Sequence, residues 1–531
     1  MRETSPAVAT GGMAATGHPL ATAAALEVLG AGGNAVDAAL AAAAVTWVVL
    51  PMMCGPGGDA FALVYDPRED EVLGVGSGGM APAAATPEWF KDRGHDLLPF
   101  DGPLSVGVPG AVGALDELAQ RYGRLEFVDH FASAIRHAER GHPVSGPAAK
   151  HYAAWRSRLA ADPESSRIYG SVGEGSLLVQ ADLAGSIEAI ATGGARAFYQ
   201  GSLAESIAAY MREAGGLLTA DDLAANCVDV YDPPSIDYRG HRVFETAPPS
   251  QGFVVLEELQ IVESFDLASL PPEGDEAIHL LVEAKKLAVE DRNAYAGDPR
   301  HVNWDLAGLL SDEHAARRAS LIDPARSRTA QAVSAAGGDT TYLCVVDRDG
   351  MAVSLVHSLS AGFGAGVTVP GTGILLNNRA GRGFALAEGH PNRIAPRKRT
   401  MSTLNCYLVT RNGKPAWVGG TPGGDGQIQW NLQLLNRVLD HGQDPQAAVA
   451  APRWTHGPTT DPWRLSEPET LKVEERLPAA TIEGLRRRGH PVQVLGPWEG
   501  GGSAQLIAID AQGGVLRGGS DPRDGGVALG R

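Results

Sequence analysis

Gly337-Gly338-Asp339-Thr340-Thr341-Tyr342-Leu343-Cys344-Val345-Val346-Asp347 is the stretch that decides the fold of this 531-residue chain. Its second half is rich in β-branched and aromatic residues, which predicts a buried β-strand over 341–347. Asp349-Gly350 then predicts a turn, and residues 352–359 a second strand. A β-hairpin is therefore expected to begin at the Thr340-Thr341 pair.

A threonine at the head of a strand can carry out chemistry that needs no other catalytic side chain. Its hydroxyl can attack the carbonyl carbon of the preceding peptide bond and form an ester that water opens. The new chain then begins with a free α-amine, whose pKa of about 8 lets it accept the hydroxyl proton near neutral pH. One residue thus supplies nucleophile and base. A Thr-Thr pair alone is more typical of an ordinary strand, so the surrounding motifs decide whether Thr340 is a nucleophile.

Further motifs occur in order along nearly the whole chain. They are Gly32–Ala39, Gly107–Gly110, Gly215–Thr219, Tyr238–Gly240, Gly373–Asn378, Pro422–Gly424, Ala451–Arg453 and Ser520–Arg523. Together with Thr340–Gly350, this series resembles the gamma-glutamyltransferase family of N-terminal nucleophile hydrolases. The resemblance implies self-cleavage between Asp339 and Thr340, with Thr340 as the catalytic residue.

The resemblance also assigns roles around the nucleophile. Gly423 and Gly424 match the glycine pair whose backbone N–H groups stabilise the oxyanion of the transition state, and glycine allows the required close approach. Ser358 matches a hydroxyl residue that contacts the amine of the nucleophile. Ser402 and Thr403 match a hydroxyl pair that binds the substrate carboxylate, and Asn378 is a further substrate-binding candidate.

Three positions depart from the family pattern. Where the family has an arginine for the substrate α-carboxylate, this chain has Gly78 in Ser77–Pro82, and glycine cannot replace a bidentate arginine contact. Where the family has Gln and Asp for the α-ammonium, this chain has Arg379 and Arg382, which would repel a cation and attract an anion. Surface or structural charge is the alternative interpretation for both arginines.

The expected fold class is α+β, a four-layer αββα sandwich with a helix-rich first two-thirds. Two more hairpins are expected at 403–420 and 504–518, around Asn412-Gly413 and Gly513-Gly514. Residues 1–339 would form a large chain and 340–531 a small chain, together one αββα unit. Helix-like spacing occurs at 21–29, 35–47, 111–121, 183–192, 202–213 and 275–295.

Composition narrows the class of partner. A net charge of −18 argues against general affinity for nucleic acid or anionic membranes. The fifteen histidines show no HExxH or paired zinc spacing, so no metal and no cofactor are expected. The acidic and basic residues at 283–292 are expected to form a solvated helix face. The four cysteines are expected to be reduced and mostly buried, and no signal peptide is visible, which predicts a cytoplasmic protein.

The sequence thus predicts a self-processing amidohydrolase or acyltransferase that acts on a small-molecule amide. Its two chains should stay together, and higher assembly is left open. Two substrate classes remain: gamma-glutamyl compounds such as glutathione, or a different small acyl amide, as in relatives that act as oxamate amidohydrolases or cephalosporin-type acylases. A non-catalytic binding homologue is the alternative from another class, since a fold alone does not prove activity.

Overall fold

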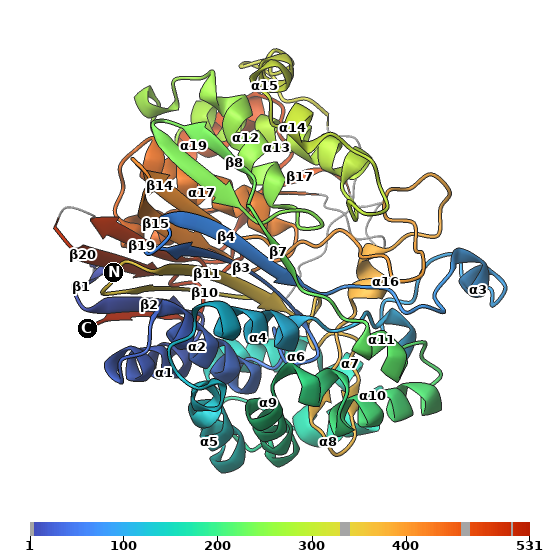
Figure 1. Ribbon diagram of the computed structural model, residues 1–531. Helices are drawn as coiled ribbons and strands as arrows, with labels where there is room; N and C mark the ends of the chain where they lie inside the picture. The colour runs from blue at the N-terminus through green and yellow to red at the C-terminus, as the bar shows by residue number, and fades with distance from the viewer. Residues whose placement is uncertain (1–4, 330–339, 458–467, 511–512) are drawn as a thin grey trace.

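Two seven-stranded sheets packed face to face form the centre of the protein in a computed structural model that describes residues 5–329, 340–457, 468–510 and 513–531 (Figure 1). Side chains from both sheets fill the space between them, among them Phe61, Tyr342, Leu408 and Ile507. Helices cover the two outer faces. The expected four-layer αββα sandwich is confirmed.

The first sheet, which we call the nucleophile sheet, holds the expected hairpin at its centre. Every neighbouring pair of its strands is antiparallel. The order is β21 (Val527–Gly530), β2 (Gly12–Thr16), β10 (Thr341–Asp347), β11 (Ala352–Ser358), β3 (Asp59–Asp66), β4 (Glu71–Ser77) and β7 (Asp229–Tyr231).

The second sheet contains the other two predicted hairpins. They are observed as the pairs β14–β15 and β19–β20, somewhat shorter or shifted relative to the predicted ranges. The order is β1 (Ala7–Ala9), β20 (Val515–Ser520), β19 (Gln505–Asp510), β15 (Lys414–Gly420), β14 (Tyr407–Arg411), β9 (His241–Glu245) and β8 (Ser235–Tyr238).

Helices cover the outer face of each sheet and are in places two deep (Figure 1). The nucleophile sheet is covered by α1 (Pro19–Gly30), α2 (Ala35–Val49), α4 (Ala111–Tyr122), α5 (Ala132–Arg140) and α9 (Ala181–Tyr199). The second sheet is covered by α12 (Gly252–Glu263), α13 (Asp275–Tyr295), α17 (Gly426–Leu439) and α19 (Ala479–Arg487). None of the described helices is long and apolar enough to cross a membrane.

The remaining described helices lie in the connections. They are α3 (Pro87–Lys91), α6 (Gly146–Ala154), α7 (Arg156–Leu159), α8 (Pro163–Tyr169), α10 (Ser202–Glu213), α11 (Ala220–Ala224), α14 (Leu306–Leu309), α15 (Asp312–Ala319), α16 (Arg379–Gly383) and α18 (Pro445–Ala450). Two small strand pairs and a three-stranded sheet complete the fold. They are β5 (His142–Pro143) with β6 (Leu177–Leu178), β12 (Thr368–Val369) with β13 (Ile374–Leu375), and β16 (Trp454–Gly457), β17 (Thr470–Glu474) and β18 (Val492–Leu495). The short helix α16 carries both arginines predicted from the sequence, Arg379 and Arg382.

Helix α13 corrects one expectation from the sequence. Glu283, Lys285, Lys286, Asp291 and Arg292 are buried rather than solvated. The helix lies against α12, α17 and α19, so its charged residues face other elements and pair with them. Alternating charges on a helix predict a solvated face only when no second layer covers that face.

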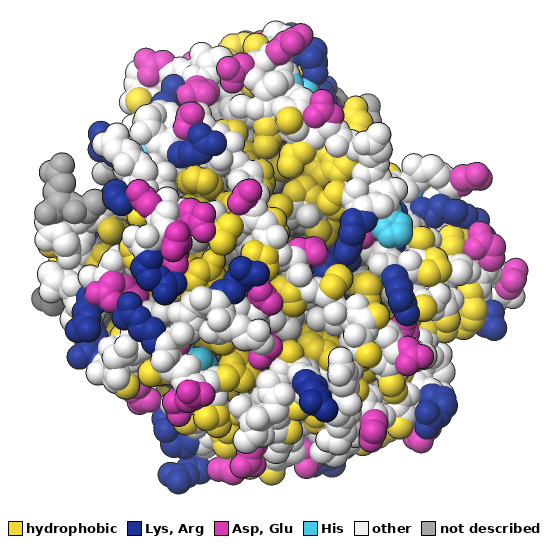
Figure 2. All heavy atoms as spheres, in the orientation of Figure 1, with side chains coloured by type: hydrophobic (Ala, Val, Ile, Leu, Met, Phe, Trp, Pro, Cys, Tyr) yellow, Lys and Arg dark blue, Asp and Glu magenta, His cyan; other side chains and the backbone are white. Residues whose placement is uncertain are grey.

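Acidic and basic side chains alternate over the face of the molecule shown in Figure 2. Hydrophobic side chains gather near the upper middle of that face, between the charged groups. Of the four cysteines, Cys54, Cys344 and Cys406 are buried and Cys227 is half-buried, and all four are free thiols.

Candidate active site

Thr340 lies directly before β10 and is buried, with 1% of its surface exposed. Its hydroxyl donates a hydrogen bond to Ser358 Oγ at 3.2 Å. Ser358 is the last residue of β11, so the hairpin that the sequence predicted brings the two hydroxyls together. Asp339, the other residue of the predicted cleavage site, lies outside the described residues.

Ser360 is a residue of this site that the sequence did not predict. Its backbone N–H donates to Ser358 Oγ at 2.8 Å. Its φ of 85° is unusual for a residue with a side chain and signals local strain. Its Oγ is buried and has no hydrogen-bond partner among the described residues. A serine in a left-handed conformation cannot be foreseen from sequence spacing, which explains why it was missed.

The predicted glycine pair follows the end of β15, close to the start of β10. A Cβ atom on Gly420 would lie 2.6 Å from the ring of Tyr342, so this strand end packs against the nucleophile hairpin. Gly423 and Gly424 have φ angles of 128° and 57°. Their carbonyl oxygens accept hydrogen bonds from the N–H groups of Gly426 and Gln427 at the start of α17. In the described part of the chain, their own N–H groups donate no hydrogen bond.

Trp430 holds this glycine loop from the helix side. A Cβ atom at Gly423 or Gly426 would collide with its indole ring. The ring also lies 2.8 Å from where a Cβ atom of Gly501 would be, so the loop at 500–502 closes over it. The indole Nε1 donates to Thr455 Oγ1 at 2.9 Å, which fixes the ring plane. The glycines are therefore required by packing as well as by backbone conformation.

A cavity of about 430 Å³ contains several of the predicted substrate-binding residues. Arg379, Arg382 and Thr403 line it, together with Arg292. The remaining wall is mostly apolar, with Leu97, Phe384, Leu386 and Met401. Thr403 Oγ1 is buried and has no hydrogen-bond partner among the described residues. A mostly apolar cavity with a few polar groups is typical of a small-molecule site.

Arg379 forms a buried ion pair with Asp59, with 2.8 Å between Nε and Oδ2. Burial raises the pKa of the Asp59 carboxyl, and the guanidinium of Arg379 opposes that rise. Asp59 also accepts a hydrogen bond from the N–H of Gly79 at 3.0 Å. A Cβ atom on Gly78 would collide with Asp59, and one on Gly79 would lie 2.8 Å from Arg379 Cγ. The two glycines and the ion pair therefore depend on one another.

Arg382 connects the cavity to the nucleophile. Its Nη1 donates to the carbonyl oxygen of Ser360 at 2.8 Å, and Ser360 in turn donates to Ser358. Asn378 lies at the same turn, but its side chain accepts from the N–H of Ala361 and donates to the carbonyl of Phe100, so it holds loops together.

Ser402 is placed differently from its neighbour Thr403. It is buried, and its Oγ accepts a hydrogen bond from the N–H of Leu404 at 3.3 Å. Its backbone carbonyl accepts from the N–H of Gln251 at 2.9 Å. Of the predicted hydroxyl pair, Thr403 is thus the member that lines the cavity.

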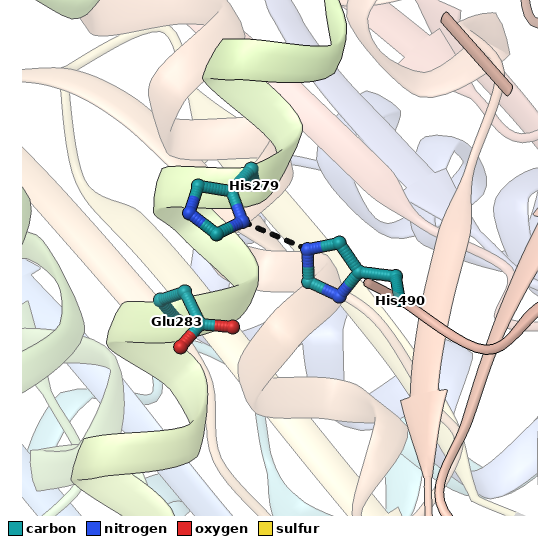
Figure 3. Close-up of side chains that lie close together, drawn as sticks. All are labelled: His279, Glu283 and His490. Carbon is teal, nitrogen blue, oxygen red and sulfur yellow. Dashed lines mark hydrogen bonds between the residues drawn. The ribbon is translucent and has the colours of Figure 1, made fainter. Parts of the chain in front are cut away.

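Two buried groups have the residue types of a metal site. One is Glu257, Asp291 and His314, and the other is His279, Glu283 and His490. In the second group, His279 Nδ1 and His490 Nε2 face each other at 2.8 Å, with Glu283 one turn along α13 (Figure 3). Glu283 is already in an ion pair with Lys286 at 2.9 Å, and His279 Nε2 contacts the carbonyl of Asp323. His490 Nδ1 has no hydrogen-bond partner among the described residues, but the other ligand atoms of this second group already have protein partners, and we assign it no metal.

An αββα sandwich with a buried threonine at the head of a central strand defines the N-terminal nucleophile class of hydrolases. The family model described as Gamma-glutamyltranspeptidase matches residues 21–531. The chain belongs to the gamma-glutamyltranspeptidase family.

Individual relatives match over nearly their whole length. The glutathione hydrolase-like YwrD proenzyme of Bacillus subtilis (strain 168) is 38% identical over 98% of this chain and 99% of the relative. The oxamate amidohydrolase proenzyme of Klebsiella pneumoniae subsp. pneumoniae is 36% identical over the same shares. Among solved structures, a cephalosporin acylase from Bacillus halodurans has a TM-score of 0.92 and 37% identity, covering 100% of this chain and 98% of its own.

Proposed function

We propose that this protein is a self-processing amidohydrolase that cleaves itself before Thr340 and then acts on a small anionic acyl amide. As a member of the family, the chain is an amide hydrolase or acyltransferase of the N-terminal nucleophile type. The observation that carries the proposal is the buried Thr340 hydroxyl, which contacts Ser358 at the head of the central hairpin.

In the first step, Thr340 Oγ attacks the carbonyl carbon of residue 339. The C–N bond before Thr340 breaks as the ester forms, and the freed nitrogen becomes the α-amine of Thr340. Water then opens the ester, and residues 1–339 and 340–531 become a large and a small chain. Proenzyme relatives of similar length support this division of the chain.

In each turnover, the same oxygen attacks the substrate carbonyl while the α-amine takes the hydroxyl proton. The N–H groups of Gly423 and Gly424 stabilise the tetrahedral oxyanion. The C–N bond of the substrate breaks, and the leaving amine receives the proton from the α-ammonium. Water attacks the acyl ester on Thr340, releases the acid and restores the hydroxyl. Ser358 orients the nucleophile through its hydrogen bond.

The cavity supports an anionic acyl group rather than a gamma-glutamyl group. Gly78 offers no guanidinium for an α-carboxylate, and the space beside Gly79 is filled by the stem of Arg379. The positive charge instead comes from α16, through Arg379 and Arg382 on the cavity wall. Asp59 compensates the charge of Arg379, but both guanidinium groups have only N–H donors, which suit a carboxylate and do not suit an α-ammonium. Because some relatives are named glutathione hydrolase, a gamma-glutamyl compound is the second candidate substrate.

The first experiment is an intact-mass measurement of the purified protein under denaturing conditions. We expect two species, separated between Asp339 and Thr340. Thr340→Ala should remain one chain and hydrolyse no amide, whereas Thr341→Ser, a change at the neighbouring residue, should cleave normally. If the wild-type protein remained a single chain for days, the self-processing proposal would be wrong and a binding function would have to be considered.

The substrate is tested by comparing oxamate with a chromogenic gamma-glutamyl anilide. We expect turnover of oxamate or a related anionic amide and little release of the anilide. Arg382→Gln should raise KM for the anionic amide by roughly 10- to 100-fold, the usual value of a charge-assisted hydrogen bond. Efficient cleavage of the anilide by the wild type would show that Gly78 does not prevent gamma-glutamyl binding.

A further inference from the structure

Arg292 occupies a central place between the cavity and the glycine loop. It comes from α13, is 1% exposed and lines the cavity beside Arg379 and Arg382. Its Nη1 donates to Asp425 Oδ1 at 2.7 Å and to Gln251 Oε1 at 2.6 Å. Asp425 follows Gly424 directly in the chain, so this guanidinium contacts the loop that holds the proposed oxyanion donors.

Gln251 extends the contact to two further points. Its Nε2 donates to the carbonyl of Thr403 at 2.9 Å and to the carbonyl of Gly424 at 3.3 Å. Because a peptide group is planar, a hydrogen bond that fixes the direction of its carbonyl also fixes the orientation of the whole group. Through Gln251 and Asp425, Arg292 therefore fixes both the glycine loop and the cavity-lining Thr403.

The charge of Arg292 has a second effect. Asp425 is a buried carboxylate immediately after Gly424, with 1% of its side chain exposed. Negative charge at this place would oppose the negative charge that develops on the substrate oxygen in the transition state. The guanidinium compensates Asp425, so the field at the glycine N–H groups stays favourable to an oxyanion.

We propose that Arg292 is a positioning residue for the reaction, one that aligns the glycine loop and neutralises Asp425. This inference rests on the proposed amidohydrolase function. It gives a role to a residue whose sequence context predicted only a solvated helix face.

The test compares variants that break the network at different points. Arg292→Gln and Gln251→Glu should each lower kcat by roughly 10- to 100-fold with KM within about threefold, as expected when donors or substrate are displaced by a fraction of an ångström. Arg292→Lys, which keeps the charge, should lose less. Gln251→Glu keeps an acceptor for Arg292 but removes both donated hydrogen bonds, and Gln251 does not line the cavity.

A matched control is available at the C-terminal end of α17, the helix that Asp425 precedes. Arg239 pairs with Asp440, which follows α17, just as Arg292 pairs with Asp425, which precedes it. Arg239→Gln removes the arginine–aspartate pair at the far end of α17 and should leave kcat within about twofold of the wild type. Circular dichroism and the melting temperature show whether each variant is folded.

The charge effect is tested by a double variant. Arg292→Gln with Asp425→Asn should be faster than Arg292→Gln alone, because the buried negative charge beside Gly424 is gone. A double variant no faster than the single one would overturn the charge argument. An Arg292→Gln protein with raised KM and unchanged kcat would show that Arg292 binds substrate directly and would overturn the positioning role.

Hydrogen exchange measured by mass spectrometry tests the positioning without any substrate. Peptides covering 402–405 and 421–427 should exchange faster in Arg292→Gln and Gln251→Glu than in the wild type and in Arg239→Gln. Unchanged exchange would overturn the inference even if activity fell. If the exchange changed as expected but the wild type cleaved no amide, the network would stand and the proposed function would fail.

Discussion

Gly423 is constrained by its backbone and its surroundings at once. Its φ of 128° lies in a region that side chains rarely adopt, and the Trp430 ring fills the position of a Cβ atom. Trp430 is itself fixed by its hydrogen bond to Thr455. Neither the loop nor the ring can move without displacing the other. A methyl group added at Gly423 would therefore displace the N–H groups that are proposed to bind the oxyanion.

Gly423→Ala should therefore lower kcat by at least about 100-fold, the usual effect of losing an oxyanion donor. The control is Gly514→Ala, at a turn with φ of 64° where a Cβ atom would meet nothing within 4 Å. That variant also places alanine at a positive φ, at a hairpin turn outside the site, and should keep its activity. Steady-state kinetics on the same amide compares the two, and equal activity would contradict the packing argument.

At the scale of single residues, the sequence predicted the site residues that lie in short motifs and missed those that long-range contacts bring to the site. Thr340, Ser358 and the glycine pair lie in motifs with recognisable neighbours, and the structure places Thr340 and Ser358 in contact. Arg292 pairs with Asp425, 133 positions away, and nothing local marks that contact. The strained Ser360 likewise depends on the fold around it.

The N-terminus of α2 shows how an element is anchored. Asn34 and Asp37 form a capping box, in which each side chain bonds the backbone of the other residue. Asp37 also accepts hydrogen bonds from the N–H of Arg124 and from His130. Burial raises the pKa of Asp37, but these hydrogen bonds outweigh it and leave the pKa below its usual value. The carboxylate thus joins α2 to the segment after α4.

Asp37→Asn should lower the free energy of unfolding by about 2–4 kcal/mol, because the amide turns an acceptor into a donor that faces other donors. Urea unfolding at neutral pH measures the change. Asp312→Asn, at an exposed position in the first turn of α15, should cost at most about 0.5–1 kcal/mol. A similar loss in both variants would mean that Asp37 contributes only a helix-end charge.

Element types, many boundaries and the four layers followed from the sequence, but the order of the strands in the sheets did not. The ranges 202–213, 275–295 and 341–347 coincide with α10, α13 and β10. Periodicity reports which residues are apolar, but strand neighbours such as β2 and β10 lie more than 300 residues apart. The hairpins that follow many helices indicated two packed sheets, but nothing in the pattern predicted the order of the strands within each sheet.

Over the whole molecule, buried ionisable groups couple stability to pH. Burial lowers the pKa of His357 to about 3 from its ordinary value of 6.5. Its contribution to stability is therefore present above pH 6.5 and is lost as the pH falls toward 3, because the unfolded chain binds the proton more readily. Burial of Glu258 raises its pKa to about 8, so its contribution is lost as the pH rises from 4.5.

His357→Gln isolates the first effect. Between pH 7.5 and 5.0 the wild type should lose about 2 kcal/mol relative to this variant, since each pH unit below 6.5 is worth about 1.36 kcal/mol. Glu258→Gln should change the slope in the opposite direction. Unfolding free energies at several pH values give both slopes, and parallel curves for wild type and His357→Gln would refute the assignment.

The strand order has a consequence for any protein cut before Thr340. In the nucleophile sheet, β10 would lie between β2 of one polypeptide and β11 of its own. In the second sheet, β20 would lie between β1 and β19, and β14 between β9 and β15 in the same way. Dilution could not separate two such polypeptides, because each holds strands that complete the sheets of the other. The pair would have no dissociation equilibrium apart from unfolding, and either half made alone would expose unpaired strand edges that invite aggregation.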